Sequence, residues 1–234
     1  IVPASLEQVV AVWAVARCGA AAVPLDPHVD GERIEDLLTD SGAVAVLAVD
    51  ESVVPAGIDW IDVADRPGDS TPITESDLVR PLSLDHTACV VHGSADRARG
   101  VTISHRALAA RAAALVRVYR ADDNSRILMA GHRSCGQSLH ALVAAVCGGT
   151  LVIAPCELRG GEELSRFLRR ERVTHWASGP AAPAATNPTG LERLQVLALT
   201  GRGYPAELVS RWGSGRTVLN LYGPGDSGVW AAAT

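Results

Sequence analysis

Lysine is absent from this 234-residue chain, and all 21 of its basic residues are arginine. A guanidinium is a planar fork of donors, whereas a lysine ammonium is a compact point charge, so the two do not replace each other at a tight anion site. No step that requires a lysine ammonium can therefore be supplied by these residues.

Disulfide and metal frameworks are missing as well. The five cysteines are an odd number, and none are spaced as C-x-x-C. We therefore expect reduced, mostly buried thiols in a cytoplasmic protein. His132 and Cys135 resemble half of a zinc site, but a second pair of ligands is lacking.

Long apolar runs and an excess of positive charge are also lacking. Gly148 and Gly149 interrupt the most apolar stretch, 139–155, which is too short to cross a bilayer. The net charge is −5 and the arginines are scattered, so neither nucleic acid nor an anionic membrane is expected as a partner.

The apolar content of 47% indicates a packed globule. The apolar start at Ile1 and the β-like end, 228–234, lead us to expect a segment of a larger polypeptide.

Helical and strand-like apolar patterns alternate along the chain. Ser5 and Asp30 occupy N-cap positions before the first two predicted helices, 6–17 and 31–39. Further helices are predicted at 106–119, 139–147, 162–172 and 205–212, and strands at 21–24, 43–49, 87–91, 127–130, 150–154, 173–176, 194–200 and 217–221. Segment 179–190 is expected to be a loop, or a short helix and a loop. Short connections between alternating elements predict an α/β fold of mostly parallel sheets flanked by helices.

A glycine-containing turn, 92–100, follows the predicted strand 87–91. Backbone N–H groups of glycine-rich turns, with a hydroxyl and a cation, cradle phosphate groups. The residues that would lie near a phosphate are Gly93, Ser94, Arg99 and Gly100. Asp96 adds a carboxylate that repels an anion, and an ordinary surface turn has a similar composition.

A second such turn, 220–228, follows the last predicted strand. Ligands of open α/β sheets bind outside the carboxyl ends of the strands. Tyr222 could stack against a base there, and Asp226 could approach a metal ion. The same residues are also typical of a tight Gly-Pro turn.

Several stretches resemble motifs of nonribosomal peptide synthetase adenylation domains, which belong to the adenylate-forming superfamily of acyl-CoA synthetases and luciferases. Residues 15–27 resemble L-K-A-G-x-A-Y-V-P-L-D-P, 32–43 resemble E-R-x…M-L-x-D-S-G-A, 100–108 resemble G-V-x-x-S-H-R-x-L, 149–155 resemble G-A-T-L-V-L-A-P, and 220–224 resemble the start of N-x-Y-G-P-T-E. The matches keep the family order. The resemblance implies a single truncated N-terminal (large) subdomain over 1–234, without the small C-terminal lid subdomain.

The chain departs from this family where the chemistry is expected. The family's phosphate loop, T-S-G-S-T-G-x-P-K-G, aligns with 91–100, where Ser94 is the remaining hydroxyl, Asp96 replaces a glycine and Arg99 replaces the lysine. Each lost charge-assisted hydrogen bond costs roughly 1.5–3 kcal/mol. The resemblance therefore implies poor binding of a triphosphate.

Two further family sites are altered. Gly225 and Asp226 replace the Thr-Glu pair beside the metal, and Mg²⁺ tolerates little geometric error. Gly136 replaces the aspartate that clamps the substrate α-ammonium. The resemblance implies vestigial nucleotide-binding residues at Gly93, Ser94, Asp96, Arg99, Gly100, Tyr222, Gly223 and Asp226, and a substrate-like pocket of Gly136, Gln137, His140, Ala198, Thr200, Leu221, Val229 and Trp230. No catalytic residue is assigned, and Asp226 would be a metal ligand only if Mg²⁺ is bound. For His140, a partly buried helix histidine is favoured over a catalytic role.

Three hypotheses about function follow. The first is a catalytically degenerate (pseudo-)adenylation domain with no expected cofactor, which acts as a structural or docking element beside carrier-protein, condensation or tailoring domains of a peptide synthetase. The second is an active enzyme that uses ATP and Mg²⁺ to adenylate a carboxylic acid without an α-ammonium, such as an aryl or keto acid, with the lid subdomain outside this segment. The third is an unrelated nucleotide-sensing or adaptor module.

Overall fold

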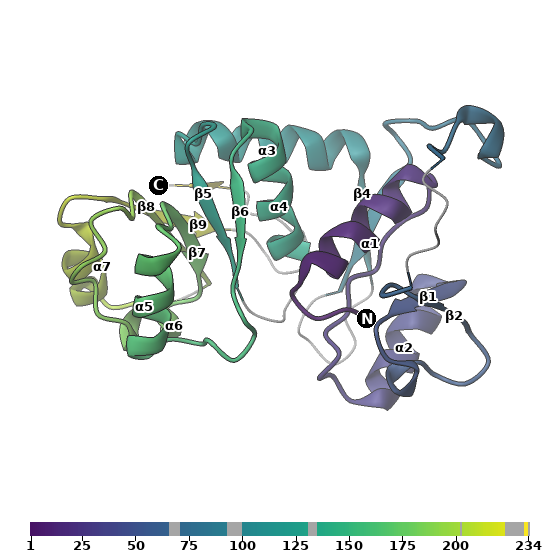
Figure 1. Ribbon diagram of the computed structural model, residues 1–234, viewed down its shortest axis with the longest axis horizontal. Coiled ribbons are helices and arrows are strands. Elements are labelled where there is room, and N and C mark those ends of the chain that lie inside the picture. Colours follow the sequence, from purple (N-terminus) through teal and green to yellow (C-terminus); the bar gives the residue numbers. More distant parts are fainter. Residues whose placement is uncertain (66–70, 93–99, 131–134, 202, 223–231, 234) are drawn as a thin grey trace. The chain divides into compact units, whose positions relative to one another are not determined.

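The computed structural model describes residues 1–65, 71–92, 100–130, 135–201, 203–222 and 232–233, with the side chains of 135–138 and 232–233 left out (Figure 1). Contacts divide the chain into two compact units. One contains residues 1–109, and the other contains most of the residues from 110 onwards.

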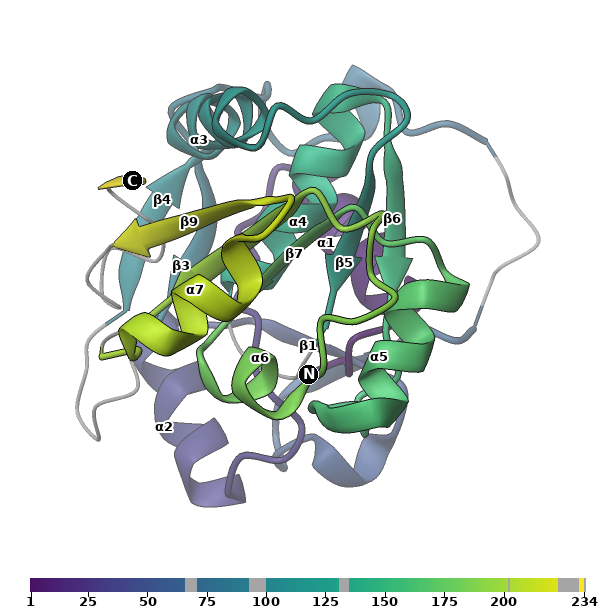
Figure 2. The same ribbon diagram turned by 90° about the vertical axis from the view of Figure 1, so that its left-hand side faces the viewer.

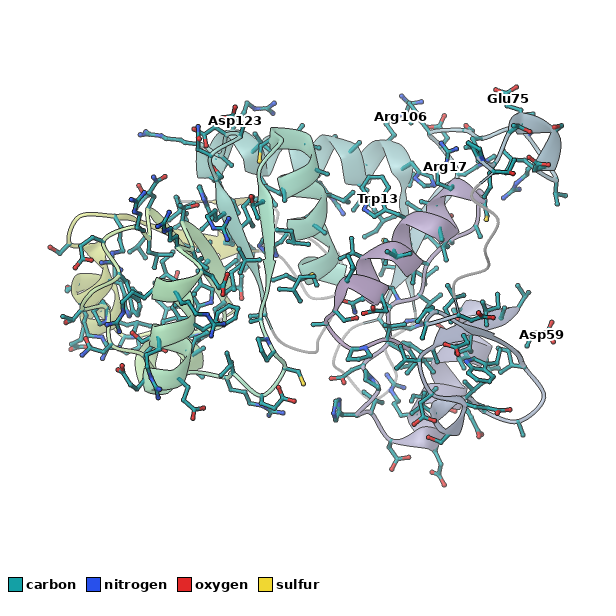
Figure 3. The ribbon with its side chains drawn as sticks, viewed as in Figure 1. Trp13, Arg17, Asp59, Glu75, Arg106 and Asp123 are labelled. Atoms are coloured by element: carbon teal, nitrogen blue, oxygen red, sulfur yellow. The ribbon has the colours of Figure 1, made fainter. Side chains whose placement is uncertain are left out.

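The first unit is built from short elements. It contains α1 (Leu6–Arg17), α2 (Gly31–Ser41), the 3-10 helices η1 (Glu51–Val53) and η2 (Glu75–Asp77), and strands β1 (Ala45–Ala48), β2 (Asp59–Asp62), β3 (Thr87–Val91) and β4 (Val101–Ser104). β1 and β2 pair in parallel. At the end of α1, Arg17 donates a hydrogen bond of 3.1 Å to the carbonyl of Ile73 (Figure 3).

The predicted helix caps are confirmed. Ser5 Oγ accepts a 3.3 Å hydrogen bond from the N–H of Gln8, and Asp30 Oδ1 accepts one of 2.9 Å from Glu32. Gly42 closes α2 in the left-handed region at φ 64°, which a residue with a Cβ adopts only at a cost. The predicted strand at 21–24 was wrong, because this segment forms only an isolated parallel bridge between Ala22 and Cys89.

Strand β4 (Val101–Ser104) was not predicted from the sequence. β3 and β4 pair antiparallel, with Val91 opposite Val101. The four residues of β4 lie between a turn and a helix start, too few for apolar alternation to be recognised. The turn 92–100 therefore connects neighbouring antiparallel strands.

The second unit is organised around one sheet. It contains the end of α3 (His105–Tyr119), then β5 (Arg126–Met129), α4 (Cys135–Cys147), β6 (Thr150–Ile153), α5 (Gly161–Arg170), β7 (His175–Ser178), α6 (Ala181–Ala185), β8 (Val196–Thr200), α7 (Ala206–Gly213), β9 (Thr217–Tyr222) and β10 (Ala232–Ala233). The strand order is β10-β9-β8-β7-β5-β6, in which β10 alone pairs antiparallel within these described strands. Figure 2 shows α4 on one side of this sheet and α5, α6 and α7 on the other. The predicted α/β fold of mostly parallel sheets flanked by helices is confirmed.

Two boundaries in this unit differ from the prediction. α4 begins at Cys135, four residues before the predicted start at 139, because its first turn carries few apolar residues that would reveal helical spacing. β7 begins at His175 rather than at Val173. α5 ends at Arg170, and Arg172, two residues later, adopts φ 51°, so the chain turns here before it enters the sheet.

The core of the second unit lies between the sheet and α5 to α7. Trp212 of α7 is fully buried and meets Trp176 of β7 edge to face, with ring centroids 5.5 Å apart. The Trp212 Nε1–H donates a 3.1 Å hydrogen bond to the carbonyl of Pro183 in α6. Arg211 donates to the same carbonyl and to those of Ala184 and Thr186. α7 thereby holds the short α6 in place.

Within the described part of the chain, no helix has both the length and the apolar character needed to cross a membrane.

Trp212→Ala should lower the free energy of unfolding by about 3–5 kcal/mol, because it leaves a cavity beside Trp176 and removes the bond to Pro183. Urea unfolding followed by circular dichroism measures this. Val209→Ala on the same helix is the control, since Val209 is 36% exposed and should cost under about 0.5 kcal/mol. Equal losses in both variants would contradict the assigned role of Trp212.

Candidate functional site

The two ends of the turn 92–100 meet at one carboxylate in the first unit. Asp40, in the last turn of α2, accepts a 2.8 Å hydrogen bond from the backbone N–H of Gly100 through Oδ2. The same oxygen lies 3.1 Å from Nε2 of His92. The His92 side chain is only 5% exposed, whereas that of Asp40 is 42% exposed. Of the residues predicted near a phosphate here, Gly93, Ser94, Asp96 and Arg99 lie outside the described residues.

Gly100 is needed for its small size at this position. A Cβ added to it would lie 2.6 Å from Cγ1 of Val90 and 2.8 Å from Nε2 of His92. Its single backbone donor is directed at Asp40. Gly100 therefore acts here as a point of close packing.

Several residues predicted for the substrate-like pocket share one face of the large sheet. Thr200 pairs with Leu221, and Ala198 pairs with Leu219, in parallel register. Directly paired residues point to the same face, and residues two apart on a strand do as well. Ala198, Thr200 and Leu221 therefore lie together. Ala198 and Leu221 are fully buried, and Thr200, at the carboxyl end of β8, is half-buried.

Tyr222 lies at the carboxyl end of β9, next in the chain after Leu221. Alternation directs its ring to the opposite face of the sheet from Leu221. The residue is 55% exposed, so its ring has an open face for stacking. Gly223, Asp226, Val229 and Trp230 lie outside the described residues.

Gly136 and Gln137 lie in the first turn of α4, and His140 follows one turn later. The structure buries His140, as the favoured interpretation of this residue expected. Its Nε2 lies 3.4 Å from the hydroxyl of Tyr119, and the two rings stack with centroids 6.3 Å apart. His140 is thus held against the end of α3.

His175 extends this polar cluster to the sheet. Its Nε2 donates to the carbonyl of Tyr119 at 3.0 Å, and its Nδ1 lies 2.7 Å from Oγ1 of Thr174. Because Nε2 donates, Nδ1 of the neutral ring is an acceptor that faces the threonine hydroxyl, and this hydroxyl also lies 3.2 Å from the carbonyl of Arg126. His175 is in register with Val196 and so points to the same sheet face as Ala198.

Burial controls the ionisation of this cluster. Desolvation lowers the pKa of His175 below its ordinary value, although the bond to the Tyr119 carbonyl and the charge of Asp122 act in the opposite direction. Desolvation also raises the pKa of the Tyr119 hydroxyl. Burial therefore favours the neutral form of both side chains, which suits an apolar sheet face.

A cavity of about 550 Å³ lies within the first unit. Its walls come mainly from α1, the segment 20–25 and β1. The lining side chains are aliphatic, with Gln8, Ser41 and Cys18 as polar exceptions and no arginine, histidine or carboxylate. This cavity lacks the groups that bind a phosphate or a metal ion.

Among the described residues, no group of three or more His, Cys, Asp or Glu side chains is placed to hold a metal ion. No role was predicted from the sequence for Asp40, His92, Tyr119 or His175. A carboxylate in the last turn of a helix opposes the helix dipole, so Asp40 is unfavourable for α2, but this signal does not identify its partners. The other three became recognisable only from their contacts.

The lowered pKa of His175 predicts a loss of stability in acid. The unfolded state, with a histidine pKa of about 6.5, binds the proton more readily than the folded state. The free energy of unfolding should therefore fall as the pH drops below about 6.5, by up to ~1.4 kcal/mol per pH unit, until the folded pKa is reached. Chemical unfolding from pH 5 to 8 measures this. His175→Gln should flatten the dependence, and His28→Gln, whose side chain is 62% exposed, should not. A parallel pH dependence in all three proteins would contradict the assignment.

The model of the AMP-binding enzyme family matches residues 1–234. The chain is 34% identical to novobiocin biosynthesis protein H of Streptomyces niveus, in an alignment that covers 99% of this chain and 41% of that protein. It is 33% identical to a probable non-canonical nonribosomal peptide synthetase, CymA, of Salinispora arenicola, in an alignment that covers 99% of this chain and 3% of that protein. It therefore spans less than half of these relatives.

Solved structures share the fold. The N-terminal subdomain of Klebsiella oxytoca NpsA, in complex with 3-hydroxybenzoyl-AMSN, superposes with a TM-score of 0.85 at 20% identity over 100% of this chain and 61% of that one. The nonribosomal peptide synthetase FmoA3, bound to α-methyl-L-serine-AMP, superposes with a TM-score of 0.84 at 23% identity over 100% of this chain and 28% of that one. The chain belongs to the AMP-binding enzyme family and has the fold of an adenylation-domain N-terminal subdomain.

Proposed function

We propose that the chain is a catalytically degenerate adenylation domain that serves as a structural or docking element of a nonribosomal peptide synthetase. The observation that carries this proposal is the contrast within one motif. His92 and Gly100, at the two ends of the predicted phosphate loop, are closely packed against each other and against Asp40. Within the loop, by contrast, Asp96 and Arg99 stand where the family has a glycine and a lysine that would meet the phosphates.

The charges of the loop argue against a triphosphate. Two like unit charges 4 Å apart repel by about 1 kcal/mol in water and about 4 kcal/mol at the effective dielectric of a protein surface. Asp96 would bring such a charge close to the anion, and the partly exposed carboxylate of Asp40 lies beside the two ends of the loop, His92 and Gly100. Arg99 restores one positive charge but not the compact geometry of an ammonium. This donor set does not fit Mg-ATP.

The start of α4 argues against an ordinary amino acid. Gly136 occupies the position of the family's clamping aspartate and brings no counter-charge. The N-terminal end of a helix carries a partial positive charge, which repels an ammonium unless a carboxylate offsets it. An α-amino acid would therefore find an unfavourable field at this end of α4.

The proposed partners are neighbouring synthetase domains. CymA of Salinispora arenicola is described as a probable synthetase, and NpsA has been solved as an artificial fusion of an adenylation domain with a peptidyl carrier protein. By analogy, we infer that this chain contacts carrier-protein, condensation or tailoring domains. The role would depend on the fold, which is preserved.

One observation favours a second function. The N-terminal subdomain of NpsA was solved with 3-hydroxybenzoyl-AMSN, whose acyl part is an aryl group. An aryl or keto acid has no α-ammonium and needs no partner at Gly136. In this alternative, the chain supplies the acid- and nucleotide-binding surfaces of an active enzyme that uses ATP and Mg²⁺.

Titration calorimetry with Mg-ATP separates the two functions. The unchanged protein should give no binding heat at millimolar ligand. The variant Ala95→Thr/Asp96→Gly should give measurable binding heat at millimolar Mg-ATP, because it removes a repulsive carboxylate and adds a hydroxyl donor.

Asp59→Asn is the charge-matched control, since Asp59 is exposed on β2 (Figure 3) and its replacement should, like the unchanged protein, give no binding heat. Micromolar binding by the unchanged protein, or pyrophosphate exchange with benzoate above background, would instead establish the active enzyme. An unchanged affinity in the loop variant would show that the loop is not directed at phosphate.

A further inference from the structure

The first unit contains two small sheets that are not joined to each other. β1 pairs with β2, and β3 pairs with β4. The extended segment 20–25 lies beside the second sheet, because Ala22 forms a parallel bridge with Cys89 of β3. Within the described part of the chain, no strand connects this segment to β1.

The segment 20–25 has one edge that is not bonded to β3. Ala22 donates a hydrogen bond to β3 and accepts one from it, both of 2.9 Å. The peptide groups of successive residues in an extended chain point to opposite sides. Those of Ala21 and Val23 therefore point away from β3, and both residues line the cavity of about 550 Å³ in this unit.

β1 presents a matching edge on the other side of the cavity. Ala48 accepts a hydrogen bond from the N–H of Val63, just after β2. Leu47, the residue before it, instead accepts one of 2.8 Å from the backbone nitrogen of Ile1, and Figure 1 shows the N-terminus beside β1. The peptide groups of Leu47 and Ala45 therefore point away from β2. This edge of β1 already binds a backbone donor at one point.

The cavity between segment 20–25 and β1, here called the slot, is apolar. Ala11, Val12 and Val15 of α1 and Leu38 of α2 line it. None of the side chains that line it is charged. A parallel sheet is normally covered on both faces, so a strand in its interior is apolar on both sides. The slot has the surroundings that such a strand requires.

We propose that the slot receives one β-strand, which runs parallel to β1 and joins the two small sheets of the first unit into one. β1 pairs with β2 in parallel, and the bridge of Ala22 to Cys89 is parallel as well, so a parallel strand continues the pattern. The strand is built from Val, Ile, Leu or Ala residues, because a charged side chain would find no partner in the slot. Sheets of two strands have little stability of their own, and the added strand removes this weakness.

The strand belongs to a part of the same protein outside these 234 residues. The NpsA N-terminal subdomain shares this fold, yet the match covers 100% of this chain and 61% of that one, so that subdomain contains further chain. α1 offers a second apolar surface to such chain. Leu6, Val10 and Trp13 share one face of this helix and are 55%, 51% and 44% exposed (Figure 3). A helix that is apolar on its outer face as well is typical of a buried position.

Hydrogen exchange measured by mass spectrometry tests the proposal on the 234-residue chain and on the full natural protein. Peptides that cover 20–25 and 43–48 should exchange about tenfold more slowly or better in the full protein, because a paired strand protects their outward N–H groups. A peptide that covers β8 is the control. It should exchange equally in both proteins, since β8 is already paired with β7 and β9.

Three outcomes would overturn the proposal. The first is equal exchange of 20–25 and 43–48 in both proteins, and the second is a natural protein without residues beyond these 234. The third is protection in the 234-residue chain that increases with protein concentration, which would place a second copy in the slot.

The variant Leu47→Glu supplies an independent measurement, since Leu47 lines the slot. In the full protein it should lower the Tm by about 4 °C or more, because the charge is buried beside the added strand. The shift should be smaller in the 234-residue chain, where the slot is open to water. Val79→Glu, at a fully exposed position, is the control and should shift neither protein. A shift for Leu47→Glu that is no larger in the full protein would overturn the proposal. Neither measurement involves a nucleotide, so their failure would leave the proposed function untouched.

Discussion

Parallel pairing of β5 to β9 constrains the whole of the second unit. Each crossover places a helix on a face of the sheet, so both faces are covered and the strands must be apolar on both sides. Buried polar groups on such a sheet must then be satisfied inside the protein. His175 meets this requirement through Thr174 and the Tyr119 carbonyl. The same pairing brings all five carboxyl ends to one edge, where Thr200 and Tyr222 lie.

The sequence predicted the elements well and their long-range contacts poorly. Caps at Ser5 and Asp30 were recognisable because they depend on a few consecutive residues. β4 was not predicted because it is only four residues long and pairs antiparallel with β3, whereas the other strands were expected to pair in parallel. α4 began earlier than predicted because glycine and polar residues in its first turn hide the helical period.

The candidate site shows a similar division. The sequence predicted the two strands that carry Ala198, Thr200 and Leu221, and the pairing of these strands then puts the three residues on one face of the sheet. The contact between Asp40 and Gly100 spans 60 residues and could not be read from spacing. The helix dipole marks Asp40 as an unfavourable charge at the end of α2, but it does not identify the residue that Asp40 contacts.

α6 illustrates how a small element depends on its neighbour. Five residues form too few hydrogen bonds to offset helix nucleation, so such a turn has little stability in isolation. Its C-terminal carbonyls are bound by Arg211 and Trp212, which both belong to α7. Release of α7 from the sheet would therefore also open α6, so the two helices are expected to exchange their amide protons together when α7 opens.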